Sequence, residues 1–211
     1  GHAGRAASAY DEAMPDAATA LEAIFDEHLR VAQAGRQALV PATARLASAI
    51  IAAFESGGRV LVFGNGGSAA DAQHLAGELT GHYRRDRRSL PVLALTTDTS
   101  VLTATANDYT YDDVFSRQVE AHCAAGDVVV GISTSGKAEN VVRGVLAARA
   151  AGAQTWALTG ATGGRLVGVA EHALQVPSDE TARIQEVHIL VIHAVSELVD
   201  AWAAEGTSAG S

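Results

Sequence analysis

The sequence has a single cysteine, Cys123, among 211 residues. One cysteine excludes an intramolecular disulfide and a zinc site made of cysteines, and it fits a reducing compartment. Aromatic residues make up only 5% of the chain, whereas alanine and glycine are abundant. This composition favours helices packed closely on a sheet and argues against an all-β sandwich.

Positive charge is also scarce, with 15 lysines and arginines against 24 aspartates and glutamates and a formal net charge of −9. General binders of nucleic acid or acidic membranes are usually basic, so we expect neither partner. A local pocket can still hold an anionic substrate.

No apolar run approaches the roughly 18 to 20 residues of a membrane span, and the N-terminus lacks a signal-peptide pattern. We therefore expect a cytoplasmic protein.

Short apolar segments alternate with segments of helical composition along the chain. The segments expected to form buried strands are residues 59–63, 91–95, 127–132, 154–158 and 172–176. The segments expected to form helices are residues 17–34, 41–56, 69–83, 138–151 and 182–204. This alternation indicates a parallel sheet with helices on both faces, in which ligands bind beyond the carboxyl ends of the strands.

The chain contains no evident linker or internal repeat, and its length suits one α/β domain. We expect a single domain over residues 1–211, with a core at about 45–204. Its N-terminal helical segment is expected at about 11–56, and a flexible tail of small and polar residues at 206–211.

A glycine-rich turn, Gly64-Asn65-Gly66-Gly67-Ser68, lies between the first expected strand and a helix. Glycines let the backbone approach a ligand and adopt positive φ angles. The helix N-terminus adds unpaired N–H groups and the positive end of a dipole. The turn is therefore a candidate anion site.

A dinucleotide-binding site is the alternative for this turn, because Gly64-x-Gly66-x-x-Ala69 matches the G-x-G-x-x-G/A fingerprint. That fingerprint requires an acidic residue about 20 residues further on. The corresponding region instead holds Asp86 among four arginines, Arg84, Arg85, Arg87 and Arg88. We expect these arginines to form a solvated loop that could steer an anionic substrate, and the missing acidic residue disfavours the dinucleotide site.

A second turn, Ser133-Thr134-Ser135-Gly136, again follows a strand and precedes a helix. Its three hydroxyls can surround phosphate oxygens in front of a helix N-terminus. Helix capping is the simpler explanation, since serine and threonine are good N-caps, but one such residue would suffice for a cap. Three in succession favour a phosphate site.

The helix after the first turn carries His74 and Glu78, which lie on one helical face at i, i+4. The pair could bind a divalent metal, or the two side chains could simply form a hydrogen bond with each other.

In the last helix, His188 is expected to be a packed residue with a satisfied ring. His193 lies in a strongly apolar stretch, where an unpartnered polar group would cost about 1 to 3 kcal/mol. Glu78 or a metal ion could be its partner.

Several motifs occur together in an order and spacing that resemble one family. They are Gly64–Leu79, Ala106–Asp108, Phe115–Gln118, Gly131–Gly136 and Arg183–His188. This combination resembles the phosphoheptose isomerases, which belong to the sugar-isomerase (SIS) domain family. The resemblance covers about residues 45–204. It implies a flavodoxin-like, three-layer α/β fold with a five-stranded parallel sheet, flanking helices and N-terminal helices.

The resemblance also implies an activity and roles for individual residues. The reaction would convert sedoheptulose 7-phosphate into D-glycero-D-manno-heptose 7-phosphate through an enediol(ate), with Glu78 as the base and His193 as the acid. The residues implied to contact the substrate are Asn65, Gly66, Gly67, Ser68, Glu78, Asn107, Asp108, Ser133, Thr134, Ser135 and Gln185. The residues that match the zinc site of some members are His74, Glu78, Gln185 and His193.

The family is generally tetrameric, with active sites at subunit interfaces, so the resemblance implies a homotetramer with one zinc ion per active site. Gln185 poses a geometric problem in this scheme. It lies eight residues before His193, or about 12 Å along a regular helix. Either the start of that helix deviates or neighbouring subunits contribute ligands to one ion.

Three positions depart from the family pattern. His82 stands where the family often has arginine, Ala138 where some members have serine, and Ala182 where some have aspartate. These departures leave the core chemistry intact but affect the sugar contacts, so another ketose phosphate is an alternative substrate. A non-catalytic SIS module that binds a phosphosugar or a replication-initiator-type protein is a further alternative. Related modules of that kind lack counterparts of Glu78 and His193.

Overall fold

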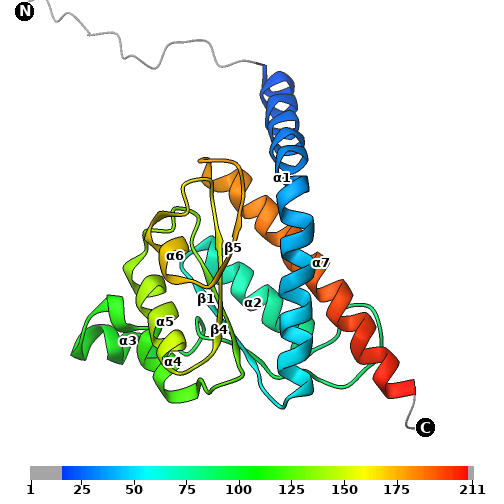
Figure 1. The fold of residues 1–211 in the computed structure, drawn as a ribbon. Coiled ribbons are helices and arrows are strands. Elements are labelled where there is room, and N and C mark those ends of the chain that lie inside the picture. Colours follow the sequence, from blue (N-terminus) through cyan, green and yellow to red (C-terminus); the bar gives the residue numbers. More distant parts are fainter. Residues whose placement is uncertain (1–15, 209–211) are drawn as a thin grey trace, which may run out of the picture.

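The computed structural model describes residues 16–208, so residues 11–15 of the expected helical segment and 209–211 of the expected tail lie outside it (Figure 1). The strands are β1 Val60–Gly64, β2 Val92–Ala94, β3 Val128–Ile132, β4 Gln154–Thr159 and β5 His172–Gln175. The helices are α1 Ala17–Glu55, α2 Gly67–Thr80, α3 Thr99–Asp108, α4 Ser116–His122, α5 Glu139–Ala150, α6 Gly164–Val169 and α7 Thr181–Ser208, with a 3₁₀ turn, η1, at Tyr111–Asp113.

The five strands form one parallel sheet in the order β2-β1-β3-β4-β5, which confirms the expected architecture. This is the flavodoxin-like strand order. The direction in which the chain adds strands reverses between β1 and β3, which pair from Val60↔Val128 to Gly64↔Ile132. The turns after β1 and β3 therefore leave the sheet side by side, at the switch point where such folds bind ligands.

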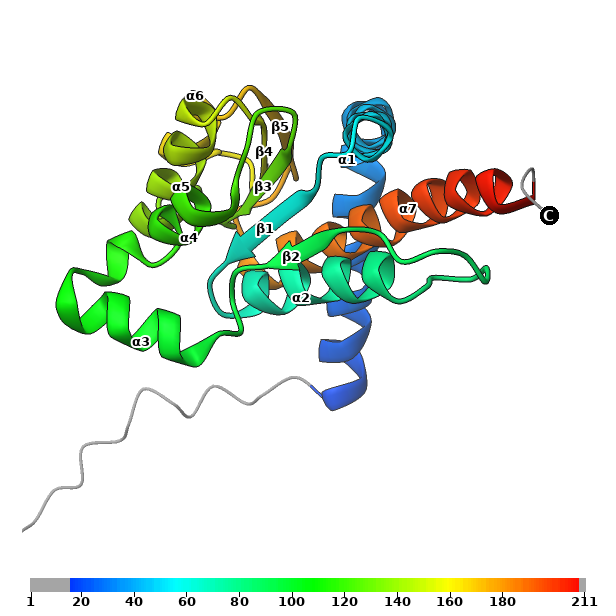
Figure 2. The ribbon, with the colours of Figure 1, turned by 90° about the horizontal axis from the view of Figure 1, so that it is seen from below.

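The strand residues alternate between two apolar layers, because successive side chains point to opposite faces of a sheet. Val60, Val62, Val128 and Val130 pack with α1, α2 and α7 on one face. On the other face, Leu61, Phe63 and Val129 pack with α4, α5 and α6. Figure 2 shows the two helical layers on either side of the sheet, with α3 projecting from one of them. The expected three-layer arrangement is confirmed.

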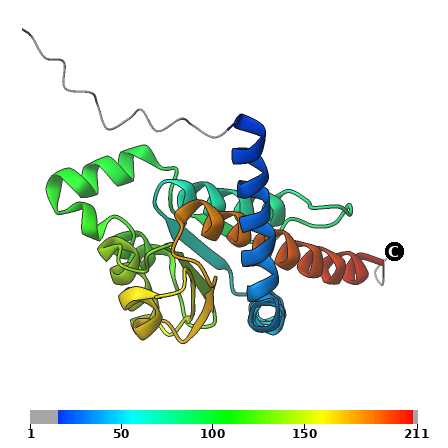
Figure 3. The ribbon, with the colours of Figure 1, turned by 90° about the horizontal axis from the view of Figure 1, so that it is seen from above.

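The N-terminal helical region differs from the expectation of two segments, because α1 runs unbroken from Ala17 to Glu55 with Pro41 inside it. Pro41 and the residue whose carbonyl it leaves without an N–H partner, Gln37, are both exposed, so water can satisfy that carbonyl. Gly35 does not break the helix either. A Cβ there would approach within 3.1 Å of Pro177, so glycine permits close packing. The first turns of α1 project beyond the sheet (Figures 1 and 3).

The C-terminal helix also differs from the expectation at its end. α7 continues to Ser208, three residues into the segment expected to be a flexible tail. The preceding turns are anchored by the buried residues Val199 and Ala203. Helix propagation adds one hydrogen bond for each residue fixed, so an anchored helix extends readily into small residues.

Two helices, α1 and α7, are long and apolar enough to cross a membrane by length and composition, each with a window of mean hydropathy 1.4. The expectation that no segment approaches a membrane span was therefore wrong on that measure. About half of each window, 44% in α1 and 50% in α7, is buried inside the fold. Both helices contribute to the core layer on one face of the sheet, which accounts for their apolar character.

Candidate active site

Three side chains from two helices meet at one point on the surface. The Nε2 atom of His74 lies 3.0 Å from Oε1 of Glu78, which follows it by one turn of α2. The Nε2 atom of His193, on α7, lies 2.9 Å from Nε2 of His74. The partner of His193 is thus His74, whereas the sequence suggested Glu78 or a metal ion. The carboxylate and the second imidazole therefore meet at the same nitrogen of His74.

This trio has the donor set and spacing of a divalent metal site. One ligand atom from each of His74, Glu78 and His193 falls within 4.8 Å of the others. Ligand atoms around a tetrahedral zinc ion lie about 3.3 Å apart, since metal–ligand distances are about 2.0 to 2.1 Å. Imidazole nitrogen and carboxylate oxygen are both zinc ligands, so only small side-chain movements are needed to fit an ion.

The first turn takes the form that its glycines allow. Gly66 has φ +56°, a left-handed conformation that glycine adopts without strain. A Cβ on Gly67 would collide with the amide of Gln185, so glycine at 67 lets α7 approach the start of α2. Ser68 is buried in the first turn of α2. The sequence-predicted residues Gly66, Gly67, Ser68 and Gln185 therefore lie close together.

Asn140 joins the two turns and was missed by the sequence analysis. Its buried amide exchanges two hydrogen bonds with Asn65, Nδ2 to Oδ1 at 2.9 Å in one direction and 2.8 Å in the other. The hydroxyl of Tyr111 donates a further hydrogen bond to Asn65 Oδ1 at 3.0 Å. These contacts fix the Asn65 side chain beside the start of α5. Only the tertiary pairing of β1 with β3 brings these residues together.

The hydroxyls of the second turn do not cap the helix that follows. The N-cap of α5 is Ala138, and no side chain accepts a capping hydrogen bond there. Ser133 is buried, Thr134 is half-buried, and the Oγ of exposed Ser135 accepts a hydrogen bond from the Lys137 N–H at 3.2 Å. The capping explanation is therefore wrong, and the hydroxyls remain available to a ligand.

Asn107 and Asp108 form no hydrogen bond or ion pair with either turn within the described residues. Both are exposed at the C-terminal end of α3, where Asn107 Nδ2 donates to Asp108 Oδ1 at 2.8 Å. Within residues 16–208 the structure does not bring them to the trio or to the serine-rich turn. Tyr111, just after them, does reach the first turn through Asn65.

Gln185 and His193 lie at different levels of the same helix. α7 is a regular α-helix from Thr181 onward, so its start does not deviate. Gln185 contacts the backbone of Gly67, whereas His193 contacts His74, seven residues further along α2. Within one chain, Gln185 is therefore remote from the trio.

Two buried titratable groups lie near the site. Burial raises the pKa of Asp71 to about 6, with the charge of His74 acting in the opposite direction. Burial lowers the pKa of His188 to about 4, although its hydrogen bond to the Thr159 carbonyl partly opposes the shift. His188 is packed as expected, but within the described residues its Nδ1 atom has no hydrogen-bond partner.

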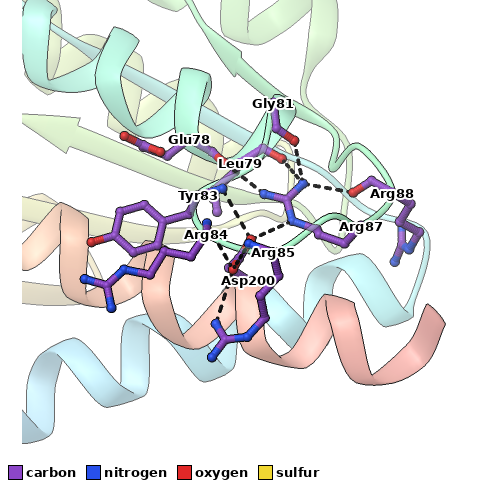
Figure 4. Close-up of polar contacts among 9 residues, drawn as sticks. All are labelled: Glu78, Leu79, Gly81, Tyr83, Arg84, Arg85, Arg87, Arg88 and Asp200. Carbon is purple, nitrogen blue, oxygen red and sulfur yellow. Dashed lines mark hydrogen bonds and ion pairs between the residues drawn. The ribbon is translucent and has the colours of Figure 1, made fainter. Parts of the chain in front are cut away.

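The arginine-rich segment after α2 is not wholly a solvated loop, contrary to the expectation. The Arg87 side chain is 0% exposed and forms an ion pair with the buried Asp200 of α7, Nε to Oδ1 at 3.1 Å (Figure 4). Arg84, Arg85 and Arg88 are exposed. No local sequence pattern predicts this pair, because 113 positions separate its members.

An apolar groove of about 810 Å³ lies between α1 and α7 and reaches the trio. Its lining includes Leu29, Val40, Leu190 and Leu198, whose side chains are exposed, and at one side His193. An open apolar groove beside a catalytic candidate is unusual for an isolated subunit, because monomers rarely expose large contiguous apolar patches.

Comparisons with known proteins point to one family and one fold. The family model of the SIS domain matches residues 25–160. The chain is 51% identical over 180 residues to a phosphoheptose isomerase of Citrifermentans bemidjiense, covering 85% of this chain and 94% of that one. It is 50% identical over 182 residues to that of Aquifex aeolicus, covering 86% and 95%. The solved phosphoheptose isomerase of Neisseria gonorrhoeae superposes with a TM-score of 0.84 at 45% identity, covering 88% of this chain and 100% of that one.

Proposed function

The chain belongs to the phosphoheptose isomerases, enzymes with an SIS domain, and on that premise we propose that it converts sedoheptulose 7-phosphate into D-glycero-D-manno-heptose 7-phosphate. It is a sugar-phosphate aldose–ketose isomerase. The observation that carries the proposed reaction is the convergence of Glu78 and His193 on one atom, Nε2 of His74.

Moving a carbonyl from C2 to C1 requires a base for a carbon-bound proton and an acid for the oxygens. Glu78 takes the proton from C1 of the ketose while His193 donates a proton to the C2 oxygen, which gives the enediol. His193 then accepts the proton of the C1 hydroxyl, and Glu78 returns its proton to C2. Both side chains regain their starting state, and the product is the aldose.

The two turns at the switch point would hold the substrate. Ser133, Thr134 and Ser135 surround the phosphate, with Ser68 beside them, since their hydroxyls do not serve as caps for α5. The first turn, at Asn65, Gly66 and Gly67, and the Gln185 amide contact the sugar phosphate. Binding the remote phosphate fixes the carbon chain in register with Glu78 and His193.

Asn107 and Asp108 contact sugar hydroxyls in this proposal. Because neither forms a hydrogen bond with the turns within the described part of the chain, we expect this role to involve closure of α3 over the substrate or a contribution to the site of a neighbouring subunit.

We assign one zinc ion per active site to His74, Glu78 and His193, whose donor atoms fit such an ion. When bound, zinc would polarise the substrate carbonyl and stabilise the negative oxygen that develops from it. Gln185 completes the ligand set only if a site draws on two subunits, because the regular α7 separates it from His193. Glu78 is then both a zinc ligand and the base. Proton transfer therefore depends on the arrangement of all three side chains.

The protein would act as a homotetramer with interfacial active sites. The apolar groove between α1 and α7, which reaches His193, supports association of copies at this face. We further assign the protein to the cytoplasm, treat residues 1–211 as one domain, and expect neither nucleic acid nor membrane among its partners, in keeping with the net charge of −9.

Conversion of sedoheptulose 7-phosphate to aldose heptose 7-phosphate tests this function directly, with product separated and quantified by anion-exchange chromatography. Ketose phosphates with five and six carbons should be run in parallel, because His82 is exposed at the end of α2 where the family often has arginine. The proposal requires the highest kcat/KM for the seven-carbon substrate. A higher kcat/KM for a shorter ketose phosphate would identify that sugar as the substrate instead. If the protein turns over none of these ketose phosphates, the proposed reaction is wrong.

A further inference from the structure

Helices α2 and α7 lie side by side and contact each other at three successive levels. At the first level the Gln185 amide packs against Gly67. At the second level His193 meets His74. At the third level, seven residues after His193, Asp200 binds Arg87, which holds the last turn of α2. The candidate catalytic groups thus lie between two structural contacts.

Arg87 binds the C-terminal end of α2 through main-chain carbonyls. Its Nη2 atom donates to the Glu78 carbonyl at 2.8 Å, and its Nη1 atom donates to the carbonyls of Leu79 and Gly81 at 2.9 Å each. Carbonyls in the last turn of a helix have no intrahelical partner. Because Arg87 is buried, its guanidinium donates hydrogen bonds to these carbonyls where water has little access. Figure 4 shows the Glu78 side chain pointing away from the guanidinium that binds its carbonyl.

Asp200 is the counterpart on α7, and it is 0% exposed. It accepts hydrogen bonds from Nε of Arg87 at 3.1 Å and from the backbone N–H groups of Tyr83, Arg84 and Arg85 at 3.1 to 3.3 Å. Burial alone would raise the pKa of Asp200, but the Tyr83 and Arg84 N–H groups and the side chains of Arg85, whose Nη1 lies 3.2 Å from Oδ2, and Arg87 lower it below its ordinary value. The carboxylate is therefore charged at neutral pH and holds the segment after α2 against α7.

The segment that Asp200 holds also packs against the candidate acid. The ring of Tyr83 lies 6.0 Å from the ring of His193, centroid to centroid, and the Cζ atom of Arg84 lies over the Tyr83 ring at 5.1 Å from its centroid. The same carboxylate thus fixes the main chain of Tyr83 and, through Arg87, the main chain of Glu78. The buried ion pair connects to both groups that the reaction needs.

We infer that Arg87 and Asp200 form a clamp that sets the separation between Glu78 and His193, and that both are positioning residues of the active site. Neither forms a hydrogen bond or ion pair with a side chain of the trio, so they act through the Glu78 backbone, through Tyr83 and through the packing of α2 on α7. The inference deepens the proposed function and rests on it for its kinetic part. Its metal-binding part rests only on the trio.

Two variants test the clamp. Asp200→Asn removes the charge while keeping the shape, and Arg87→Lys keeps the charge while losing the fork that binds the Glu78 carbonyl. At a temperature where each variant is folded by circular dichroism, we expect kcat to fall roughly tenfold to a hundredfold, since displacement by about 1 Å has that effect. KM should change less than about threefold, because the serine-rich turn is untouched. Zinc affinity, measured by competition with a chromophoric chelator, should weaken about tenfold or more.

Asp127→Asn is the matched control. Asp127 is also a buried aspartate, with a side chain 3% exposed, and it accepts backbone N–H bonds from Arg59 at 2.9 Å and Ala124 at 2.8 Å. Asp127 comes immediately before β3. It therefore lies at the opposite end of the strand from the serine-rich turn. This variant should lose stability but keep kcat and zinc affinity within about twofold of the parent.

The possible results distinguish a failure of the clamp proposal from a failure of the proposed function. If the clamp variants match Asp127→Asn in kcat and zinc affinity, the clamp proposal is wrong and the ion pair is only structural. If Asp200→Asn does not fold, Arg87→Lys decides. A parent protein that binds zinc but has no isomerase activity contradicts the proposed function alone, and zinc affinity then still tests the clamp. A parent that does neither overturns both.

Discussion

The Nε2 atoms of His74 and His193 lie 2.9 Å apart, although 119 positions separate the two residues in the chain. One comes from the helix after the glycine-rich turn and the other from the last helix. Glu78 joins them through the i, i+4 spacing of α2, with its Oε1 atom 3.0 Å from His74. The site is therefore made by the packing of α2 on α7, and its chemistry depends on that packing.

Replacing Glu78 by glutamine should abolish most of the activity while leaving the fold intact. The amide keeps the shape of the side chain but cannot accept a proton from carbon, so kcat should fall about 10²- to 10⁴-fold. The side chain is 24% exposed, and the melting temperature should change little. Steady-state kinetics and a thermal melt of the same preparation check both points. Activity within tenfold of the parent would remove Glu78 as the base.

Zinc should stabilise the parent protein against heat through the trio. A ligand that binds only the folded state at 100 times its Kd stabilises by about 2.7 kcal/mol, and chelation should reverse that gain. His74→Ala should lose the zinc-dependent rise in melting temperature, whereas His122→Ala, at an exposed histidine in α4, should keep it. An equal rise in all three proteins would place the bound zinc elsewhere.

Removing one hydroxyl from the serine-rich turn should weaken substrate binding more than the chemical step. Thr134→Val keeps the shape of the half-buried side chain and removes a donor to a charged phosphate, which is worth about 1.5 to 3 kcal/mol. KM should rise roughly 10- to 100-fold with kcat within about threefold. Thr19→Val, at an exposed threonine of α1, is the control. An unchanged KM in Thr134→Val would mean that the turn does not hold the phosphate.

His188 should make the fold sensitive to mild acid. Its folded pKa of about 4 lies below the ordinary value of 6.5, so its contribution to stability is present above pH 6.5 and is lost as the pH falls toward 4. A shift of that size corresponds to about 3 kcal/mol. Asp71, with its pKa raised to about 6, acts in the opposite direction over the same range, so parent and variant must be compared at each pH.

Urea unfolding of the parent and of His188→Gln between pH 7.5 and 4.5 measures this effect. The variant should lose less stability on acidification than the parent, by about 2 to 3 kcal/mol. His122→Gln, at an exposed histidine, should follow the parent. Parallel curves for the parent and His188→Gln would assign the acid sensitivity to other groups.

The sequence predicted the sheet well because its strands carry strong local signals. Each strand is a short apolar run bounded by a turn, as in Val60–Gly64 before the glycine-rich turn. The helices at Thr99–Asp108, Ser116–His122 and Gly164–Val169 were not predicted. They are short, and isolated helices of that length are marginal, so tertiary contacts rather than local sequence determine them.

The candidate site could be predicted only where its spacing is local. His74 and Glu78 follow from one helical turn, and the hydroxyls of the second turn follow from their position after a strand. Asn140 and Arg87 could not be found in this way, because their partners lie 75 and 113 positions away. Gln185 is a different case: the resemblance assigns it to the metal site, while within one chain α7 places it against Gly67, so a role as ligand stays a prediction that depends on a second subunit.

Incubation of the parent protein with sedoheptulose 7-phosphate in D₂O, followed by proton and deuterium NMR, tests the central claim most directly. If Glu78 carries the carbon-bound proton and exchanges it with solvent, the aldose heptose 7-phosphate should form with deuterium at C2, and Glu78→Gln should give neither the aldose nor the label. Absence of both aldose and solvent deuterium with the parent would contradict the account.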